Sequence, residues 1–145
     1  MLWFSIATLL PVLLLALAGL SGGVWCLVAL LYLTGFTYLM DRLAQGAAAR
    51  RNADGEFPVG EELALFLGFA HLVLIWIALY AIGGDSGLGL VERLLCFIAF
   101  GLFFGQVSNA NAHELIHKQA RLPRWLGITV YISLLFGHHA SAHPR

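Results

Sequence analysis

The chain has 145 residues, of which 60% are hydrophobic and only 11% are charged, and its mean hydropathy is +0.84. Soluble domains carry about 45–50% apolar and about 25% charged residues, so this composition excludes an ordinary soluble domain and favours a chain that lies in a bilayer. Eight basic and eight acidic residues give a formal net charge of zero. Because there is no basic excess, nothing in the charge balance points to nucleic acid.

Four apolar stretches are long enough to be membrane helices, since a helix needs about 20 residues to cross the hydrocarbon core. They cover roughly residues 2–20, 24–40, 63–82 and 90–107. Pro11 is tolerated in the first stretch, as it often is in membrane helices. No Lys or Arg opens the chain, and a second apolar run follows at once. We therefore interpret the first stretch as a helix that stays in the membrane, not as a signal peptide.

The short turns at 21–23 and 83–87 carry no Lys or Arg, whereas the polar segment 41–62 and the segment after the fourth stretch carry several. The positive-inside rule then places the N-terminus and the end of the fourth stretch in the cytoplasm. A fifth apolar stretch, 126–137, is too short to cross a bilayer of about 30 Å. We expect a single all-α domain over residues 1–145: a polytopic membrane bundle of about four transmembrane helices plus one short re-entrant or buried helix.

The string NANAHELIHKQ follows the fourth stretch directly and carries His113 and His117. Positions i and i+4 share one face of a helix, so both imidazoles can point at one ion. Gln106 and Asn109 precede His113 by seven and four residues and extend a polar stripe along the same helix. Because a polar stripe is costly against lipid, we expect it to face the bundle interior. There it could hydrogen-bond the second nitrogen of a ligand imidazole.

The C-terminal string GHHASAHPR adds His138, His139 and His143. If the short fifth stretch does not cross the bilayer, these histidines return to the membrane face that holds the first pair. Histidines near a membrane interface can be simple amphipathic anchors. Five of them in so short a segment favour a metal site instead, since imidazole is the commonest metal-binding side chain.

HELIH also matches the zinc peptidase motif, in which Glu114 would be the general base. A catalytic zinc needs only three protein ligands, yet three more histidines follow, and no acidic residue after His117 could supply a carboxylate ligand. A histidine-rich site without cysteine suits iron or another transition metal that imidazole binds well. The residues alone leave both chemistries open.

The strings NANAHELIHK, RLPRWLG and GHHASAH together resemble the integral-membrane alkane 1-monooxygenases, which belong to the histidine-box superfamily of membrane fatty acid desaturases and hydroxylases. The resemblance implies that HELIHK is the first histidine box and that His143 opens the second. The metal ligands implied are His113, His117 and His143, and Glu114 is the candidate catalytic residue. His138 and His139 match no histidine box and, with Asn109 and Gln106 of the polar stripe, are candidate accessory groups.

The same resemblance implies two irons that use dioxygen to hydroxylate the terminal methyl of an alkane or a related lipid-like chain. It also implies a rubredoxin-type electron donor and a metal site on the cytoplasmic side of the bacterial inner membrane. An alkane has no hydrogen-bonding group, so a pocket can select it only by length and shape, at about 0.8 kcal/mol per methylene.

The chain stops at Arg145, before the rest of the second box and all of the third. We therefore expect the N-terminal part of such an enzyme, truncated at its C-terminus and inactive alone. An inert remnant is a further alternative.

Other residues of note receive less specific interpretations. His71 lies midway along the third stretch, where an ionisable residue is a functional hypothesis by default. It matches no histidine box, so we interpret it as a neutral, hydrogen-bonded interior residue. Cys26 and Cys96 lie inside apolar runs and are expected to be small buried hydrophobes instead of a disulfide or metal pair. Arg50 and Arg51 are candidates for docking a redox partner.

Overall fold

The computed structural model describes residues 2–48 and 61–137, and for residues 2–4, 36–37 and 39–48 it describes the backbone only. Every regular element in these ranges is helical. The helices are α1 (Leu2–Ser21), α2 (Val24–Ala48), α3 (Glu61–Gly83), α4 (Leu90–Leu102), η1 (Phe103–Ser108), α5 (Asn109–Ile116) and α6 (Arg121–Ser133). The all-α expectation is confirmed for the described ranges. Arg50, Arg51, His138, His139 and His143 lie outside them.

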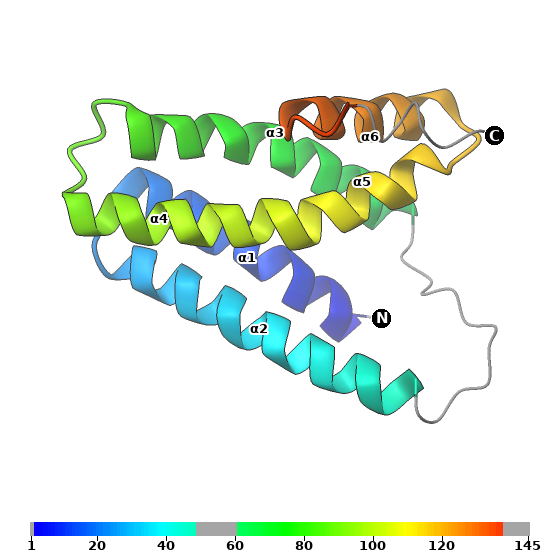
Figure 1. Cartoon of the computed structure of the whole chain (residues 1–145), viewed down its shortest axis with the longest axis horizontal. Helices are drawn as coiled ribbons and strands as arrows, with labels where there is room; N and C mark the ends of the chain where they lie inside the picture. The colour runs from blue at the N-terminus through cyan, green and yellow to red at the C-terminus, as the bar shows by residue number, and fades with distance from the viewer. Residues whose placement is uncertain (1, 49–60, 138–145) are drawn as a thin grey trace.

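The helices form an elongated bundle (Figure 1). α1 and α2 make a hairpin, α2 also packs on α4, and α3 packs on α1 and α4. α4, η1 and α5 follow one another as a single rod along the length of the bundle, and α6 turns back along this rod to pack on α5 and α3. The loop before α4 and the turn before α6 therefore lie at opposite ends of the molecule.

The bundle has an apolar interior and a largely apolar exterior. Leu15, Leu33, Leu74, Phe100 and Phe103 are buried in the main core. Many large apolar side chains are nevertheless exposed, among them Leu13, Trp76 and Phe97. An apolar outer surface of this kind suits lipid better than water.

Within the described residues, two helical segments are long and apolar enough to cross a membrane, by length and composition: Glu61–Gly83 and Leu90–Ile116. They correspond to the third and fourth predicted stretches and, with the apolar surface, indicate membrane association. α1 and α2 occupy the first two predicted stretches, and α2 continues beyond the predicted end into the polar segment, as far as Ala48. The count of four spans stays a prediction.

One end of the bundle, which we call the turn end, consists of the α1–α2 turn and the α3–α4 loop. Gly22 and Gly23 have φ values of 62° and 60°, a backbone region that glycine adopts without strain. The carboxylate of Glu92 accepts hydrogen bonds from the N–H of Gly23 at 2.6 Å and from the N–H of Gly89 at 2.7 Å. One side chain therefore joins the two connections.

Arg93 adds further hydrogen bonds at the turn end. Its Nε donates to the carbonyl of Leu88 at 2.9 Å, and its Nη1 donates to the carbonyl of Ile82 at 2.8 Å. The second bond satisfies a carbonyl in the last turn of α3, where intrahelical partners are missing. Glu92 and Arg93 thus anchor the loop that leads into the long rod.

The rod contains a π-turn, η1, directly before the histidine motif. The backbone N–H of Asn109 bonds to the carbonyl of Phe104, five residues earlier, in addition to a bond to Gln106. A π-turn holds one more residue than an α-turn, and such turns are frequent at functional sites. Because the rod stays helical through η1, the fourth predicted stretch continues to Ile116 and contains most of the motif.

The fifth predicted stretch, 126–137, is α6, but the helix begins earlier and ends earlier, at Arg121 and Ser133. Pro123 lies in the first turn, where its missing N–H has no intrahelical partner to lose. After Ser133 the chain reverses through Leu135, whose φ is 62°, and the N–H of Phe136 bonds to the carbonyl of Tyr131 at 2.8 Å. α6 has 13 residues, in accord with the expected short helix, and it buries one face on α5 and α3 while its other face is exposed.

Candidate metal centre

His113 and His117 lie side by side at the end of the rod. His113 is in the last turn of α5, and His117 follows its last residue with φ −80° and ψ −11°. Their ring centroids are 4.7 Å apart, and the ring planes cross at 64°. Two imidazoles that bind one metal through nitrogens at about 2.0–2.1 Å place their centroids roughly 4.5–5 Å apart. The separation of the described pair lies in this range, and it is also that of an ordinary edge-to-face ring contact.

The rest of the predicted ligand set cannot be placed relative to this pair. His138, His139 and His143 lie outside the described ranges, so the predicted gathering of five imidazoles stays a prediction. Among the side chains that the structure describes, no group of three or more His, Cys, Asp or Glu residues could hold a metal ion.

The expectation that the polar stripe faces the bundle interior is wrong for the described chain. Gln106, Asn109, His113 and His117 are all exposed. The opposite face of the rod packs on α3 and α6, because that face carries the apolar side chains Ala112 and Leu115 that the neighbouring helices can bury.

The buried amide of this region is Asn111, which the sequence interpretation missed. Its Nδ2 donates to the carbonyl of Ala64 in the first turns of α3 at 2.9 Å. A signal was present in the sequence, since Asn111 precedes the buried Leu115 by four residues and follows the buried Ser108 by three. Helical spacing places these three side chains on one face.

Glu114 lies about 100° further round the helix than His113, since an α-helix has 3.6 residues per turn. Its side chain is exposed, and its Oε1 is 2.6 Å from Nζ of Lys118, an i,i+4 ion pair. The carboxylate is therefore held along the helix surface by Lys118. Its predicted catalytic role stays a prediction.

An open cavity of about 350 Å³ lies beside His113, lined by Asn109, Ala110, His113, Tyr131 and Phe136. Small-molecule pockets typically measure about 300–1,000 Å³, so the cavity lies at the low end of that range. The phenol of Tyr131 is uncharged at neutral pH, because even its ordinary pKa is about 10 and burial raises that pKa further.

His71 is fully buried, and its Nε2 lies 2.7 Å from Oγ of Ser133 in the last turn of α6. The Ser133 hydroxyl donates its one hydrogen to the carbonyl of Val130 at 2.7 Å, so Nε2 of His71 is the donor to Oγ. The ring also meets Phe104 of η1 edge-on, at a centroid distance of 4.8 Å. The expectation of a hydrogen-bonded interior histidine is confirmed, and its contacts join α3, α6 and the π-turn.

Two buried polar atoms near this junction have no hydrogen-bond partner among the described residues: Nδ1 of His71 and Oγ of Ser108. At the other side of the bundle, Cys26 and Cys96 are free and buried, as expected. Their sulfur atoms are 3.3 Å apart, which joins α2 to α4. Local sequence patterns could not predict that proximity, because 70 residues separate the two positions.

Comparisons with known proteins extend the description of this site. No protein-family model matches the chain, and no solved structure matches it. The chain is similar to alkane 1-monooxygenase 2 of Alcanivorax borkumensis, with 22% identity over 138 residues that cover 90% of this chain and 36% of that protein. The chain thus spans about a third of the length of this relative. Together with two membrane-length apolar helices, this distant similarity is consistent with a membrane-associated monooxygenase.

Proposed function

We propose that this chain supplies part of the active site of a non-haem di-iron monooxygenase that hydroxylates the terminal methyl of alkanes or related lipid-like chains. The observation that carries the proposal is the His113–His117 pair, with ring centroids 4.7 Å apart at the end of a membrane-length apolar rod. The similarity to an alkane 1-monooxygenase supports it. Neither the comparisons nor the described residues support the zinc peptidase alternative.

In this proposal His113 and His117 hold iron, with His143 as a third ligand and a second iron bound by residues outside the described ranges. Iron supplies the dioxygen chemistry that an unactivated C–H bond requires, because acids, bases and nucleophiles do not attack such a bond. The protein's part is to orient the imidazoles and to exclude water. The π-turn turns the rod so that the packed face bears Asn111 and Leu115 while the histidines point outward, toward the side where further ligands would join them.

The cavity beside His113 is our candidate for the end of the substrate channel. Tyr131 and Phe136 give it aromatic walls, and Asn109 and His113 contribute its polar atoms. An apolar chain end could lie against the aromatic walls with its terminal carbon directed toward the histidine pair. We propose that electrons come from a rubredoxin-type donor on the cytoplasmic face. The Glu114–Lys118 ion pair lies at the surface near the two histidines.

The decisive experiment measures iron in the full-length protein, purified in detergent after growth with added iron. We expect His113→Ala, His117→Ala and His143→Ala each to lower the iron content and to abolish hydroxylation of a medium-chain alkane. Asp85→Ala is the matched control, since Asp85 is an exposed potential ligand at the turn end. It should leave both measurements unchanged.

Glu114→Gln separates the proposal from peptidase chemistry. A peptidase uses this glutamate as its base, so loss of all activity with the metal retained would favour a peptidase. The monooxygenase proposal expects iron to be retained and hydroxylation to be reduced only in part. Wild-type protein that contains one zinc and no iron would contradict the proposal.

A further inference from the structure

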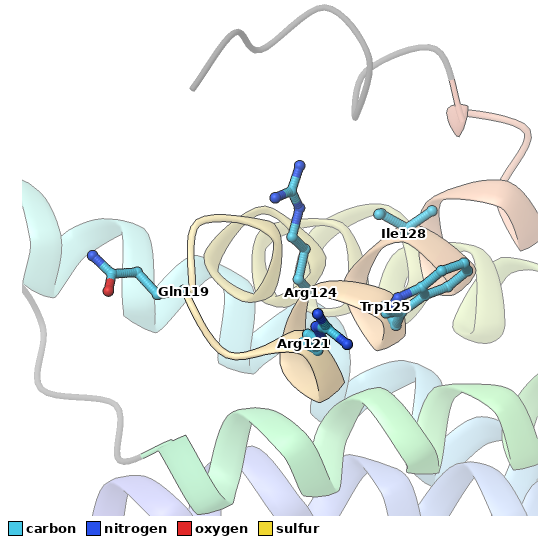
Figure 2. Close-up of a pocket in the computed structure, with 5 residues that line it drawn as sticks. All are labelled: Gln119, Arg121, Arg124, Trp125 and Ile128. Atoms are coloured by element: carbon cyan, nitrogen blue, oxygen red, sulfur yellow. The ribbon is translucent and has the colours of Figure 1, made fainter.

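The turn between α5 and α6 and the first half of α6 form an open cavity of about 650 Å³ that the proposed function does not use. It is lined by Gln119, Arg121, Arg124, Trp125 and Ile128 (Figure 2). Four of these residues come from α6, and Figure 2 shows the Arg124 side chain extended outward from that helix. The cavity therefore combines two guanidinium groups with an aromatic and an aliphatic wall.

The two guanidinium groups have no carboxylate partner in the part of the chain that the structure describes. No described Asp or Glu forms an ion pair with Arg121 or Arg124, and the first turn of α6 contains no acidic residue. Both arginines lie in the first turns of the helix, where the partial charge of the backbone is already positive. Two cations at this position repel each other and the helix end, and an anion bound between them would offset that repulsion.

The outer face of α6 changes from basic to aromatic to aliphatic along its length. Arg121, Trp125, Ile128 and Ile132 are spaced by four, three and four residues, which places them on one helical face. Trp125 is 68% exposed and Ile132 is 60% exposed. This is the order of chemical groups that a phospholipid presents, from its phosphate through its glycerol region to its acyl chains.

The depth of this face in a membrane agrees with that order. α6 begins just beyond the end of the membrane-length rod Leu90–Ile116 and runs back along it (Figure 1). With a rise of 1.5 Å per residue, Trp125 lies about 6 Å and Ile132 about 16 Å further along the helix than Arg121. The headgroup layer is roughly 5–8 Å thick on each side of the hydrocarbon core. Arg121 and Arg124 would therefore lie among the headgroups, Trp125 at the boundary where Trp is enriched, and Ile132 among the acyl chains.

We propose that this cavity binds the phosphate of an anionic phospholipid such as phosphatidylglycerol, through Arg121 and Arg124, with Trp125 and Ile128 against the glycerol and upper acyl chain. Guanidinium groups match phosphate oxygens in geometry as well as in charge. An acidic protein would satisfy the arginines but not an exposed apolar face that continues to Ile132. The inference rests on membrane association and is independent of iron and of hydroxylation.

The test places the full-length protein in nanodiscs of neutral phosphatidylcholine with a minor fraction of brominated lipid, and measures tryptophan fluorescence. Bromine quenches only nearby indoles, and the difference between wild type and Trp125→Phe isolates the Trp125 signal from that of every other tryptophan of the protein. We expect brominated phosphatidylglycerol to quench Trp125 several-fold more than brominated phosphatidylcholine at the same mole fraction. About fivefold per arginine is typical of basic residues at an anionic surface.

Three variants decide whether the two arginines cause this preference. Arg121→Gln combined with Arg124→Gln should abolish it, whereas Arg121→Lys combined with Arg124→Lys should retain most of it, because the charge is kept. Arg50→Gln combined with Arg51→Gln removes the same charge from another segment and should retain it fully. If the glutamine double variant does not fold, the lysine double variant still tests the proposal, because it must keep the preference for phosphatidylglycerol.

Several results would overturn the inference. Equal quenching by the two brominated lipids would show that Trp125 has no anionic neighbour. A preference that survives in the glutamine pair would place the anionic lipid elsewhere. Complete displacement by dissolved glycerol phosphate would identify a site for a soluble phosphate. Loss of binding to an acidic electron donor in the glutamine pair, with the lipid preference unchanged, would identify the surface as a protein-docking site.

Discussion

The two ends of the bundle use their polar groups in opposite ways. At the turn end, Glu92 and Arg93 make four hydrogen bonds to the backbone, three in the two connections and one in the last turn of α3. At the other end, which we call the histidine end, Gln106, Asn109, His113 and His117 are exposed on the rod. Polar side chains thus stabilise the connections at one end and are presented to the outside at the other. If the proposed function holds, the hydrogen bonds that stabilise the connections and the metal ligands lie at different ends of one helical rod.

The first prediction concerns the π-turn and should have the largest effect on the histidine end. Gly105 lies in η1 beside open space, since a Cβ added there would meet no atom within 4 Å. An alanine inserted after Gly105 adds a second extra residue, which is more than one π-turn absorbs, so the residues beyond it would rotate by about 100° relative to α4. Either the histidines or the packed face of Asn111 and Leu115 must then leave its present position. We expect loss of bound iron together with a lower thermal midpoint.

Gly105→Ala is the control for this insertion, since it keeps the length of the rod and adds a methyl group in open space. It should bind iron like the wild type. If the protein with the inserted residue retained full iron content and thermal stability, the register of the rod would have no part in orienting the motif.

The second prediction concerns the contact between α5 and α6. A Cβ at Gly127 would lie 2.9 Å from the carbonyl oxygen of Ala112 and 2.9 Å from Cβ of Leu115. We expect Gly127→Ala to lower the free energy of unfolding by about 1–3 kcal/mol, the typical cost of overpacking, in a denaturant titration in detergent. Gly101→Ala is the matched control, because it adds a methyl group in open space within α4. That change should be neutral or stabilising by up to about 1 kcal/mol.

The third prediction tests the turn end by itself. Glu92→Gln keeps the shape of the side chain but replaces one accepting oxygen by an amide nitrogen, so one of the two bonds to Gly23 and Gly89 is lost and the other is weakened. We expect a lower thermal midpoint with unchanged iron content. Asp85→Asn, an exposed neutral replacement at the same end, should change neither. A loss of iron in Glu92→Gln would show that the two ends are not separate.

The fourth and smallest expected effect is the coupling between His71 and Ser133, which links the middle of α3 to the end of α6. Ser133→Ala leaves the Nε2–H of His71 buried without an acceptor, at a cost of about 1–3 kcal/mol. His71→Phe removes both the donor and the unpartnered Nδ1, so the double variant should be more stable than the sum of the single effects implies. A double-mutant cycle should give a coupling of about 0.5–1.5 kcal/mol. Strict additivity would contradict the hydrogen bond.

Periodicity and length predicted the helices well where the chain is uniformly apolar. The third stretch was expected at 63–82 and is found at Glu61–Gly83. The start of α6 was missed because the predicted stretch began with the apolar run at Leu126, whereas the helix begins at Arg121 and tolerates Pro123 in its first turn. The π-turn was missed because the choice between bonds to the fourth and fifth preceding residue depends on packing that a local pattern does not contain.

The site was predictable in its local geometry but not in its surroundings. The i,i+4 spacing correctly placed His113 beside His117. We expected Gln106 and Asn109 to face the bundle interior, because a polar stripe is costly against lipid. That expectation was wrong, since the side of the rod that packs on α3 and α6 is the apolar one. The partner of His71 could not be read from the sequence, since 62 residues separate it from Ser133.

The π-turn has a consequence for how related sequences should be aligned. A helix can absorb a single inserted residue as a π-turn while the segments on both sides keep their own neighbours. A relative with a plain α-turn at Phe103–Ser108 would then need a one-residue gap there, although both rods remain helical throughout. Aligners that forbid gaps inside helices would shift HELIH by one position in such a pair. In such an alignment, a one-residue gap at this point followed by matching HELIH motifs would indicate that one protein has the π-turn and the other has a plain α-turn.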